Sequence, residues 1–326
     1  MILALAASMI LQQSVALQAR PFPGLSEEGR EVGCMRMDAG FTLTSNEELG
    51  GYSSMLLGEG EGRLTLLSDA GHIVEADVSF GESGVVSGLT QTVRYPIAFP
   101  PALGRGRDTE ALVALGSGKF LVSRERSGDL VEMERGPQGY RVTRQMLDLK
   151  PDFPRLGNNG FEAVAPYRDG FLLVPEKVTD GEAPVLHWEG ETLEEVARLK
   201  MTDGFAVTEI VADQTRDTLF VLQRSFSRRT GPRARVSVVR LGDLGGDALL
   251  ETWLLGQLSF LDGADNMEAM ALREAPDGTL RLLLASDDNF NPVQRTVLMD
   301  LDLAGCDLTA AEPRARGDDE AQSRID

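Results

Sequence analysis

Acidic, amide and basic side chains follow an apolar run near the C-terminus. In "LLLASDDNFNPVQRT" the run ends in Asp287, Asp288 and Asn289, and Arg295 follows closely. Carboxylate and amide oxygens bind hard cations such as calcium, whereas the planar guanidinium of arginine matches phosphate and carboxylate groups. Because such an apolar run indicates a buried strand, we expect these groups to gather where the strand meets solvent.

The same arrangement recurs along the chain. Each repeat has a short apolar strand, a polar turn, a second apolar strand and a charged ending. The repeats are "YSSMLLGEGEGRLTLLSDAG", "DTEALVALGSGKFLVSRERSG", "NGFEAVAPYRDGFLLVPEK", "VTEIVADQTRDTLFVLQRSF" and "NMEAMALREAPDGTLRLLLASDDNF". A glutamate heads four of them, at Glu110, Glu162, Glu209 and Glu268, and Ser54 takes that place in the first.

These repeats predict one polar site with two kinds of group. The expected metal ligands are carboxylates, namely Asp69, Asp108, Glu110, Glu162, Glu209, Glu268, Asp287 and Asp288. Among them, Glu110, Glu162, Glu268 and Asp287 are the candidates for catalysis. The groups expected to bind an anionic substrate are Arg124, Lys177, Arg224, Asn289 and Arg295. A bound metal in such a site would act as a Lewis acid and activate a water molecule.

A purely structural interpretation stands beside this one. Asp and Asn at strand ends are common turn formers, and repeated glutamates can pair with repeated arginines to hold sheets together. Crowded carboxylates without a cation or a basic partner would instead repel one another, and some would keep protons.

The spacing of the repeats predicts the elements that position these residues. The heads recur about every 47 to 59 residues, which is the period of propeller blades. Within a repeat, "EALVAL", "KFLVSRE", "DLVEMERG" and "RVTRQMLDL" supply four strands, the content of one blade. We therefore expect an all-β propeller with five blades by strand count, or six if one repeat is divided differently. A β-sandwich does not account for this period.

The last repeat lacks a fourth strand, and the N-terminal "CMRMDAGFTLT" can supply it. Closing the ring in this way removes two open sheet edges. Cys34 would begin this strand and Cys306 would follow its neighbour, so antiparallel pairing brings the two together and predicts a disulfide. The predicted propeller domain covers residues 30–306.

Composition limits the partners. The net charge of −19 argues against nucleic acid, which calls for a basic face, and is compatible with cation binding. With only His72 and His187, a histidine-rich zinc site is excluded. We expect a monomer that acts on a small molecule.

The two ends of the chain differ from the repeats. "MILALAASMILQQSVALQAR" is too short to span a bilayer, and small residues near Ala19 suit a signal peptidase, so residues 1–19 are predicted to be a signal peptide. A buried N-terminal helix is the alternative. Export would place the protein in the periplasm or outside the cell. The polar tail, residues 311–326, is predicted to be disordered.

Several motifs resemble one family. "GGYSSM", "LLSDAG", "DTEALVAL", "FLVSRE", "NNGFEAVA", "DNMEAMAL" and "SDDNFNPVQRT" are similar to those of the family called esterase-like activity of phytase, over roughly residues 30 to 304. The sequence departs from the family pattern at Ser53-Ser54, where Ser-Gly is common, and at "LSDAG", which replaces Asp-Arg-Gly. The resemblance implies a β-propeller and hydrolysis of an ester or phosphoester.

We therefore predict an exported hydrolase of phosphate or carboxylic esters, assisted by calcium, at the polar mouth of a propeller channel. The alternative is a non-catalytic propeller that binds a ligand or a protein through the same mouth.

Overall fold

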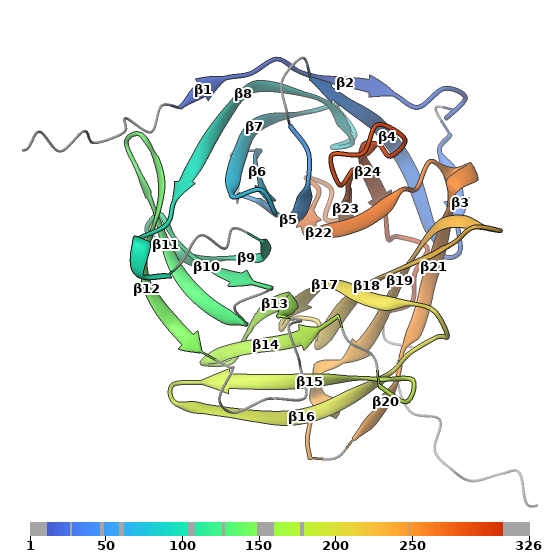
Figure 1. Cartoon of the computed structure of the whole chain (residues 1–326). Coiled ribbons are helices and arrows are strands. Elements are labelled where there is room, and N and C mark those ends of the chain that lie inside the picture. The colour runs from blue at the N-terminus through green and yellow to red at the C-terminus, as the bar shows by residue number, and fades with distance from the viewer. Residues whose placement is uncertain are drawn as a thin grey trace, which may run out of the picture.

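The structure, a computed structural model, describes residues 12–26, 28–45, 49–58, 62–103, 108–125, 128–148, 160–176, 179–246 and 248–308. Its strands form mainly antiparallel sheets arranged around a common centre (Figure 1). Only short 3-10 helices occur in this part of the chain, at η1 (Pro101–Leu103), η3 (Leu241–Asp243) and η4 (Phe260–Asp262). None of them has the length or the hydropathy to cross a bilayer.

The described strands divide into five antiparallel units of four strands, which we call blades 1 to 5. Blade 1 contains β5 (Tyr52–Leu57), β6 (Arg63–Ser68), β7 (His72–Phe80) and β8 (Val86–Ala98). Blade 2 contains β9 (Thr109–Gly116), β10 (Lys119–Arg124), β11 (Asp129–Gly136) and β12 (Gly139–Asp148). Blade 3 contains β13 (Phe161–Tyr167), β14 (Gly170–Pro175), β15 (Glu182–Glu189) and β16 (Thr192–Lys200). Blade 4 contains β17 (Ala206–Asp213), β18 (Thr218–Ser227), β19 (Gly231–Arg240) and β21 (Trp253–Ser259).

Blade 5 combines both ends of the described chain. Its strands are β22 (Asn266–Glu274), β23 (Leu280–Asp287), β24 (Thr296–Asp302) and β4 (Met35–Ser45). β4 pairs with β24 in an antiparallel register that runs from Thr296 opposite Leu43 to Asp302 opposite Arg36. The innermost strands β5, β9, β13, β17 and β22 contact one another in turn around the centre, and β22 returns to β5. The predicted all-β propeller, closed by the N-terminal strand, is confirmed.

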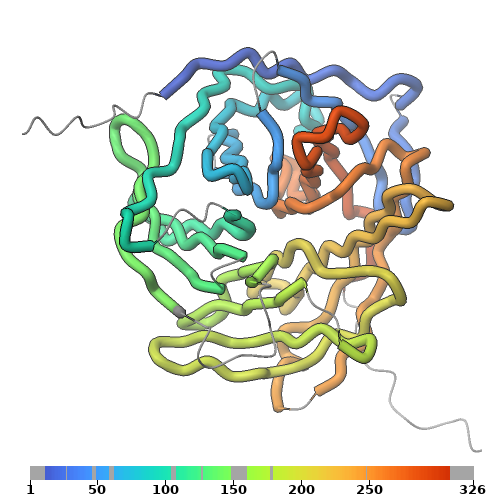
Figure 2. The backbone as a smooth tube through the Cα atoms, in the orientation of Figure 1, coloured from blue at the N-terminus to red at the C-terminus, as the bar shows by residue number. Residues whose placement is uncertain are grey.

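The N-terminal segment, blue in Figure 2, runs along the outside of the ring, and short strands pair with the outer strands of the blades. β1 (Gln13–Ser14) pairs with β8, β2 (Leu17–Pro21) and β3 (Arg30–Val32) pair with β4, and β20 (Leu249–Glu251) pairs in parallel with β16. β1 and β2 include residues of the predicted signal peptide, and residues 1–11 lie outside the described part. The signal peptide stays a prediction, and so does the disordered tail, since residues 311–326 are also outside that part.

The apolar core lies between the blades, in five clusters that each join two neighbours. In β18, for example, Phe220 and Leu222 pack toward blade 5 while Leu219 and Val221 pack toward blade 3. Successive side chains of a strand point to opposite faces, so a strand buried on both faces needs a continuous apolar run. This explains why the repeats carry such runs.

Ring closure is reinforced by covalent and ionic contacts. Cys34 and Cys306 form a disulfide with their Cα atoms 4.9 Å apart, as predicted. Arg281 on β23, only 3% exposed, donates to Asp300 on β24 at 2.9 Å and to Asp38 on β4 at 2.8 Å. Burial opposes the charge of Asp38, but hydrogen bonds from Arg36 and Arg281 outweigh it and lower its pKa. The buried ion pairs therefore join the N-terminal strand to the C-terminal ones.

Candidate functional site

A register shift near the start of each innermost strand directs polar side chains to the centre of the ring. The residues at these five shifts are Ser53, Glu110, Glu162, Thr208 and Glu268. Such β-bulges re-aim a side chain and are common next to active sites. Where the bulge carries a short hydroxyl, it binds the next blade: Ser53 donates to the Thr109 carbonyl and Thr208 to the Met267 carbonyl. The bulge residues of the other three blades are glutamates, whose longer side chains extend toward the centre of the ring.

Glu209 and Ser54 lie one residue beyond the bulge, whereas the aligned repeats placed them at the same position as the other three glutamates. We expected Glu209 to share the position of the other glutamates, but it pairs with Leu222 and follows the bulge residue Thr208. Glu209 is 4% exposed and accepts a 2.7 Å hydrogen bond from Ser54 across the ring. Burial raises its pKa well above the usual value, although Ser54 and the Ile210 amide oppose the shift. The segments "VTEI" and "MEAM" have similar apolar residues on both sides of the glutamate. Such a pattern does not show which residue forms the bulge.

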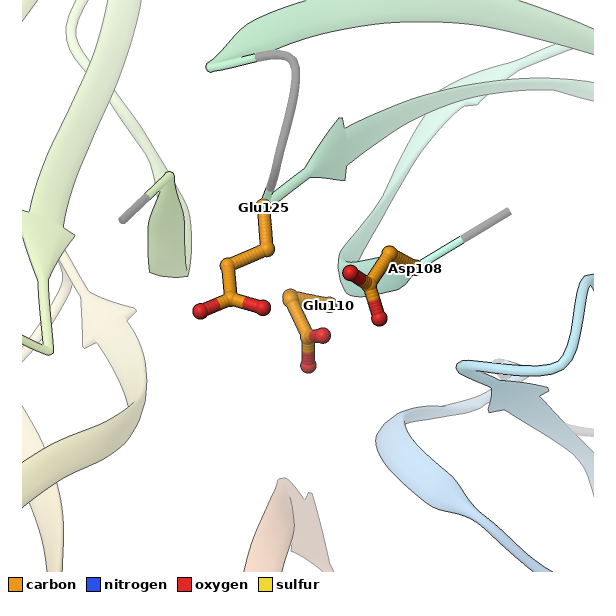
Figure 3. Close-up of side chains that lie close together, drawn as sticks. All are labelled: Asp108, Glu110 and Glu125. Atoms are coloured by element: carbon orange, nitrogen blue, oxygen red, sulfur yellow. The ribbon is translucent and has the colours of Figure 1, made fainter. Parts of the chain in front are cut away.

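Blades 2 and 3 bring five carboxylates together. Oxygen atoms of Asp108, Glu110 and Glu125 lie within 4.8 Å of one another, with the carboxylates turned toward a common space (Figure 3). Glu125 also belongs to a second such group with Glu162 and Glu176. Glu125 and Glu176 follow β10 and β14 at matching positions of adjacent repeats. Neither is among the ligands predicted from the sequence, although their matching positions in adjacent repeats were a usable signal.

Backbone contacts fix this arrangement. The Glu125 amide donates to the Asp108 carbonyl at 3.0 Å, which joins the end of β10 to the start of β9. Gly160 precedes β13, and a Cβ atom there would lie 2.5 Å from the Glu125 Cα. Glycine therefore allows the chain entering blade 3 to pass against the carboxylates of blade 2.

The carboxylates of the cluster are buried close to one another, and the neighbouring positive charges do not balance their negative charge. Burial, followed by repulsion from Glu162 and Glu268, raises the pKa of Glu110 well above its usual value. Burial and the charge of Glu268 do the same for Glu162. Without a cation these two groups therefore hold their protons to higher pH than ordinary glutamates do.

Arg224 connects the cluster to blade 5. Its guanidinium lies 2.9 Å from Glu176 of blade 3 and 2.9 Å from Glu268 of blade 5. Burial raises the pKa of Glu268 to about 8 despite Arg224. Burial likewise raises the pKa of Asp287 to about 7, with help from Asp69 and Asp288. Both carboxylates could exchange protons near neutral pH.

Asp69 and Asp288 hold the loop before β5. The Gly51 amide and the Thr296 hydroxyl each donate to Asp288 at 3.0 Å. A Cβ at Gly51, whose φ is +64°, would lie 2.2 Å from an oxygen of Asp69. Burial raises the pKa of Asp69, and the charges of Asp108 and Asp288 add to this rise. These two acids belong to neither of the two carboxylate groups found in the described residues.

The residues predicted to bind an anion do not lie together. Among them, Arg224 contacts the glutamates Glu176 and Glu268. Arg124 is buried and pairs with Asp129, while Arg295 pairs with Asp265 at 3.4 Å. Asn289 is exposed, and its backbone amide donates to Asp287. Lys177 lies outside the described residues.

The donor chemistry of the carboxylate cluster fits a hard cation. Asp108, Glu110, Glu125, Glu162 and Glu176 offer only oxygen atoms, the donor type that calcium prefers, in two groups of three that share Glu125. No histidine or cysteine belongs to either described group, so zinc or another soft metal is a poorer match.

Comparisons with solved structures return folds of low similarity. A hemopexin fold protein from cow pea has 12% identity and a TM-score of 0.40, covering 66% of this chain and 96% of that one. A luciferin-regenerating enzyme has 9% identity and a TM-score of 0.42, covering 78% and 92%. A glucose dehydrogenase has 12% identity and a TM-score of 0.43, covering 81% and 98%.

A search of curated proteins finds no match. Residues 47–290 match the Phytase-like family, described as esterase-like activity of phytase. This range contains all five blades' innermost strands and the whole carboxylate cluster. The chain therefore belongs to the esterase-like activity of phytase family.

Proposed function

We propose that the protein is a hydrolase of phosphate or carboxylic esters that works with calcium at the mouth of the propeller. The observation that carries the proposal is the convergence of five carboxylates from blades 2 and 3, one of which, Glu176, pairs with Arg224 at 2.9 Å. The family to which the chain belongs supports ester hydrolysis. The disulfide supports an oxidising compartment, so we propose export to the periplasm or the medium.

Each group has a proposed role. Asp108, Glu110, Glu125, Glu162 and Glu176 would hold the cation, which supplies Lewis-acid chemistry to an ester or phosphoryl oxygen. Glu268 and Asp287 would take a proton from the attacking water and return it to the leaving group, because their pKa values of about 8 and about 7 lie near neutral pH.

Arg224 would orient the substrate. Its guanidinium already contacts Glu176 and Glu268 at 2.9 Å, so an anionic substrate would share it with these two residues. Cation binding by Glu176 would weaken one of the two pairs and leave the guanidinium able to receive a phosphate or carboxylate.

Calorimetric titration of metal-stripped protein with calcium, combined with a turnover screen on phosphate and carboxylic esters, tests the proposal. We expect saturable binding and calcium-dependent turnover. Glu110→Gln should weaken calcium binding about tenfold or more, because it removes a charged ligand, and Glu268→Gln should abolish turnover while leaving calcium bound. Glu194→Gln, an exposed acid on the outermost strand of blade 3, is the matched control and should change neither quantity.

The outcomes separate the functions. Calcium binding without turnover of any ester would favour the alternative, a propeller that binds a ligand or a protein without catalysis. Failure to bind calcium would mean that the carboxylates are balanced by protons and by Arg224, and would refute the metal-assisted mechanism.

A further inference from the structure

The hairpin of β18 and β19 carries positive charge in an acidic protein. Residues 218–242 contain six arginines and no acidic residue, whereas the whole chain has 51 acidic and 32 basic residues. Arg228 and Arg229 lie at the exposed turn of this hairpin. In the part of the chain that the structure describes, neither of them forms an ion pair with a carboxylate, and nor does Arg233. The hairpin therefore presents unbalanced positive charge to solvent.

The end of this hairpin stands clear of the strands beside it. β17 pairs with β18 only as far as Arg224, so residues 225–227 continue beyond β17. β21 pairs with β19 only as far as Arg233, so residues 231–232 continue beyond β21. The gold loop that joins the two strands projects past the rim of the ring on the right of Figure 2.

Large apolar side chains are exposed at the same end. The exposed fractions are 71% for Phe226, 54% for Phe260 and 87% for Leu261. Phe226 lies opposite Pro232 in the hairpin. A Cβ atom on Gly231 would lie 3.7 Å from the Cβ of Phe260, so η4 packs against the hairpin end. Two segments of blade 4 thus bring their exposed apolar residues together.

The acids of the η4 segment do not neutralise the arginines of the turn, because each already has a partner. Asp262 lies 3.6 Å from Arg30, and Asp265 lies 3.4 Å from Arg295. The guanidinium carbon of Arg295 also lies 5.2 Å from the centre of the Phe260 ring. The exposed aromatic ring is therefore bordered by positive charge.

Two half-buried arginines of β19 extend the positive charge behind the turn. The guanidinium carbons of Arg233 and Arg235 lie 5.1 Å and 5.3 Å from the centre of the Phe205 ring. Because successive residues of a strand point to opposite faces, these two lie on the other face of the hairpin from Pro232. Both faces of the hairpin end are therefore basic or apolar.

We propose that the tip patch, formed by Phe226, Arg228, Arg229, Phe260 and Leu261, docks the protein on a lipid bilayer with anionic headgroups. The apolar side chains enter the boundary between headgroups and acyl chains, and the arginines bind the lipid phosphates. A surface of this charge would repel the rest of the protein, whose net charge is −19, so a basic patch is needed to approach it. A projecting hairpin end suits a flat surface, whereas a bound peptide usually lies in a groove.

Docking also orients the carboxylate site. Arg224 lies on the same strand face as Phe226, two residues earlier in β18. At roughly 3.3 Å per residue, the turn at Arg228 lies about 13 Å farther along the hairpin than Arg224. The mouth of the propeller is therefore held toward the bilayer. The docking itself needs neither calcium nor hydrolysis, so it stands apart from the proposed function.

Flotation of the oxidised full chain with lipid vesicles, in chelator, tests the charged part of the patch. We expect flotation with phosphatidylcholine vesicles that contain about 30% phosphatidylglycerol, loss of flotation at high salt, and little flotation with pure phosphatidylcholine. Arg228→Gln with Arg229→Gln should weaken partition about tenfold or more, because each arginine near an anionic surface contributes to binding. Arg141→Gln with Arg144→Gln removes the same charge from exposed positions of β12 and should leave partition unchanged.

The apolar part is tested with exposed residues, whose replacement should leave the melting temperature unchanged. Phe226→Ser should weaken partition several-fold. Leu115→Ser is the control, because Leu115 is an exposed apolar residue at the end of β9 far from Glu110. Phe226→Trp should be quenched by vesicles with brominated acyl chains more than the wild type, in which Trp188 is buried and Trp253 lies at the far end of β21.

Three results would overturn the proposal. They are no flotation with anionic vesicles, equal flotation of the wild type and the Arg228→Gln, Arg229→Gln variant, and equal quenching of the wild type and Phe226→Trp. Retention on polyglutamate without flotation would replace the bilayer by an acidic protein partner. None of these results bears on calcium binding or ester turnover, so failure here is distinguishable from failure of the proposed function.

Discussion

The stability of the metal-free protein should fall as pH rises through the neutral range. Glu268 has a pKa of about 8 in the folded protein and an ordinary value of 4.5, and Asp287 has about 7 against 3.8. Between these values the folded protein holds protons that the unfolded chain has already released. The contribution of these two groups to stability is therefore full below about pH 4 and is lost as pH rises through about 8.

The size of the loss follows from the same pKa values. One pH unit of difference between folded and unfolded pKa is worth about 1.4 kcal/mol, so Glu268 alone sets an upper limit of about 5 kcal/mol. Glu268 and Asp287 repel each other and share Arg224, so their contributions do not add. We expect a decrease of about 3 kcal/mol in the free energy of unfolding between pH 5 and pH 9.

Urea denaturation of chelated, oxidised protein at several pH values measures this decrease. Glu268→Gln should flatten the profile because it removes the group with the higher pKa, whereas Glu194→Gln should preserve the slope. Calcium should restore stability above pH 7, since it balances the charges that deprotonation creates. A metal-free profile that is flat or rises between pH 5 and pH 9 would refute the assignment of protons to these carboxylates.

Three further predictions concern stability. Arg281→Met should cost about 3 to 5 kcal/mol in urea denaturation, because it leaves buried Asp300 with one fewer cation. Cys34→Ser with Cys306→Ser should cost about 3 kcal/mol or more, because it releases a loop of 272 residues in the unfolded chain. Glu209→Gln should raise stability at pH 8 by about 1 kcal/mol and leave calcium affinity unchanged, because it replaces a buried acid that lies outside the two carboxylate groups.

Each of these has a clear contrary result. A change below 1 kcal/mol for Arg281→Met would show that solvent replaces the lost guanidinium. Equal stability of oxidised and cysteine-free protein would show that β4 remains paired without the disulfide. Weaker calcium binding by Glu209→Gln would place Glu209 among the ligands after all.

The architecture was predictable because it follows from periodic features of the sequence. Apolar runs buried on both faces recur at blade length, and the incomplete last repeat pointed to the N-terminal strand. Cys34 and Cys306 flank that pairing, so the same inference gave the disulfide. These are properties of pattern and spacing, which do not depend on atomic detail.

The site was predictable only in part, because bulges and rotamers decide it. A one-residue bulge moves Glu209 out of the position held by Glu162. Arg124 and Arg295 turn to acids close by in space, and no sequence pattern shows that choice. The arginine pair on β19 follows neither the repeat nor any motif, because its environment is created by packing against Phe205 of the preceding linker.

Closure of blade 5 by β4 also sets an order of events during synthesis. β4 leaves the ribosome before the other strands of blade 5, and its partner β24 is made about 250 residues later. Until then, β4 is an open strand edge with an apolar face, exposed to other chains in the way that favours aggregation. The pairing of β4 with β24, which joins the residues farthest apart in the sequence, therefore forms last, when the other blades can already fold. The ring becomes cooperative only when the two ends of the chain meet.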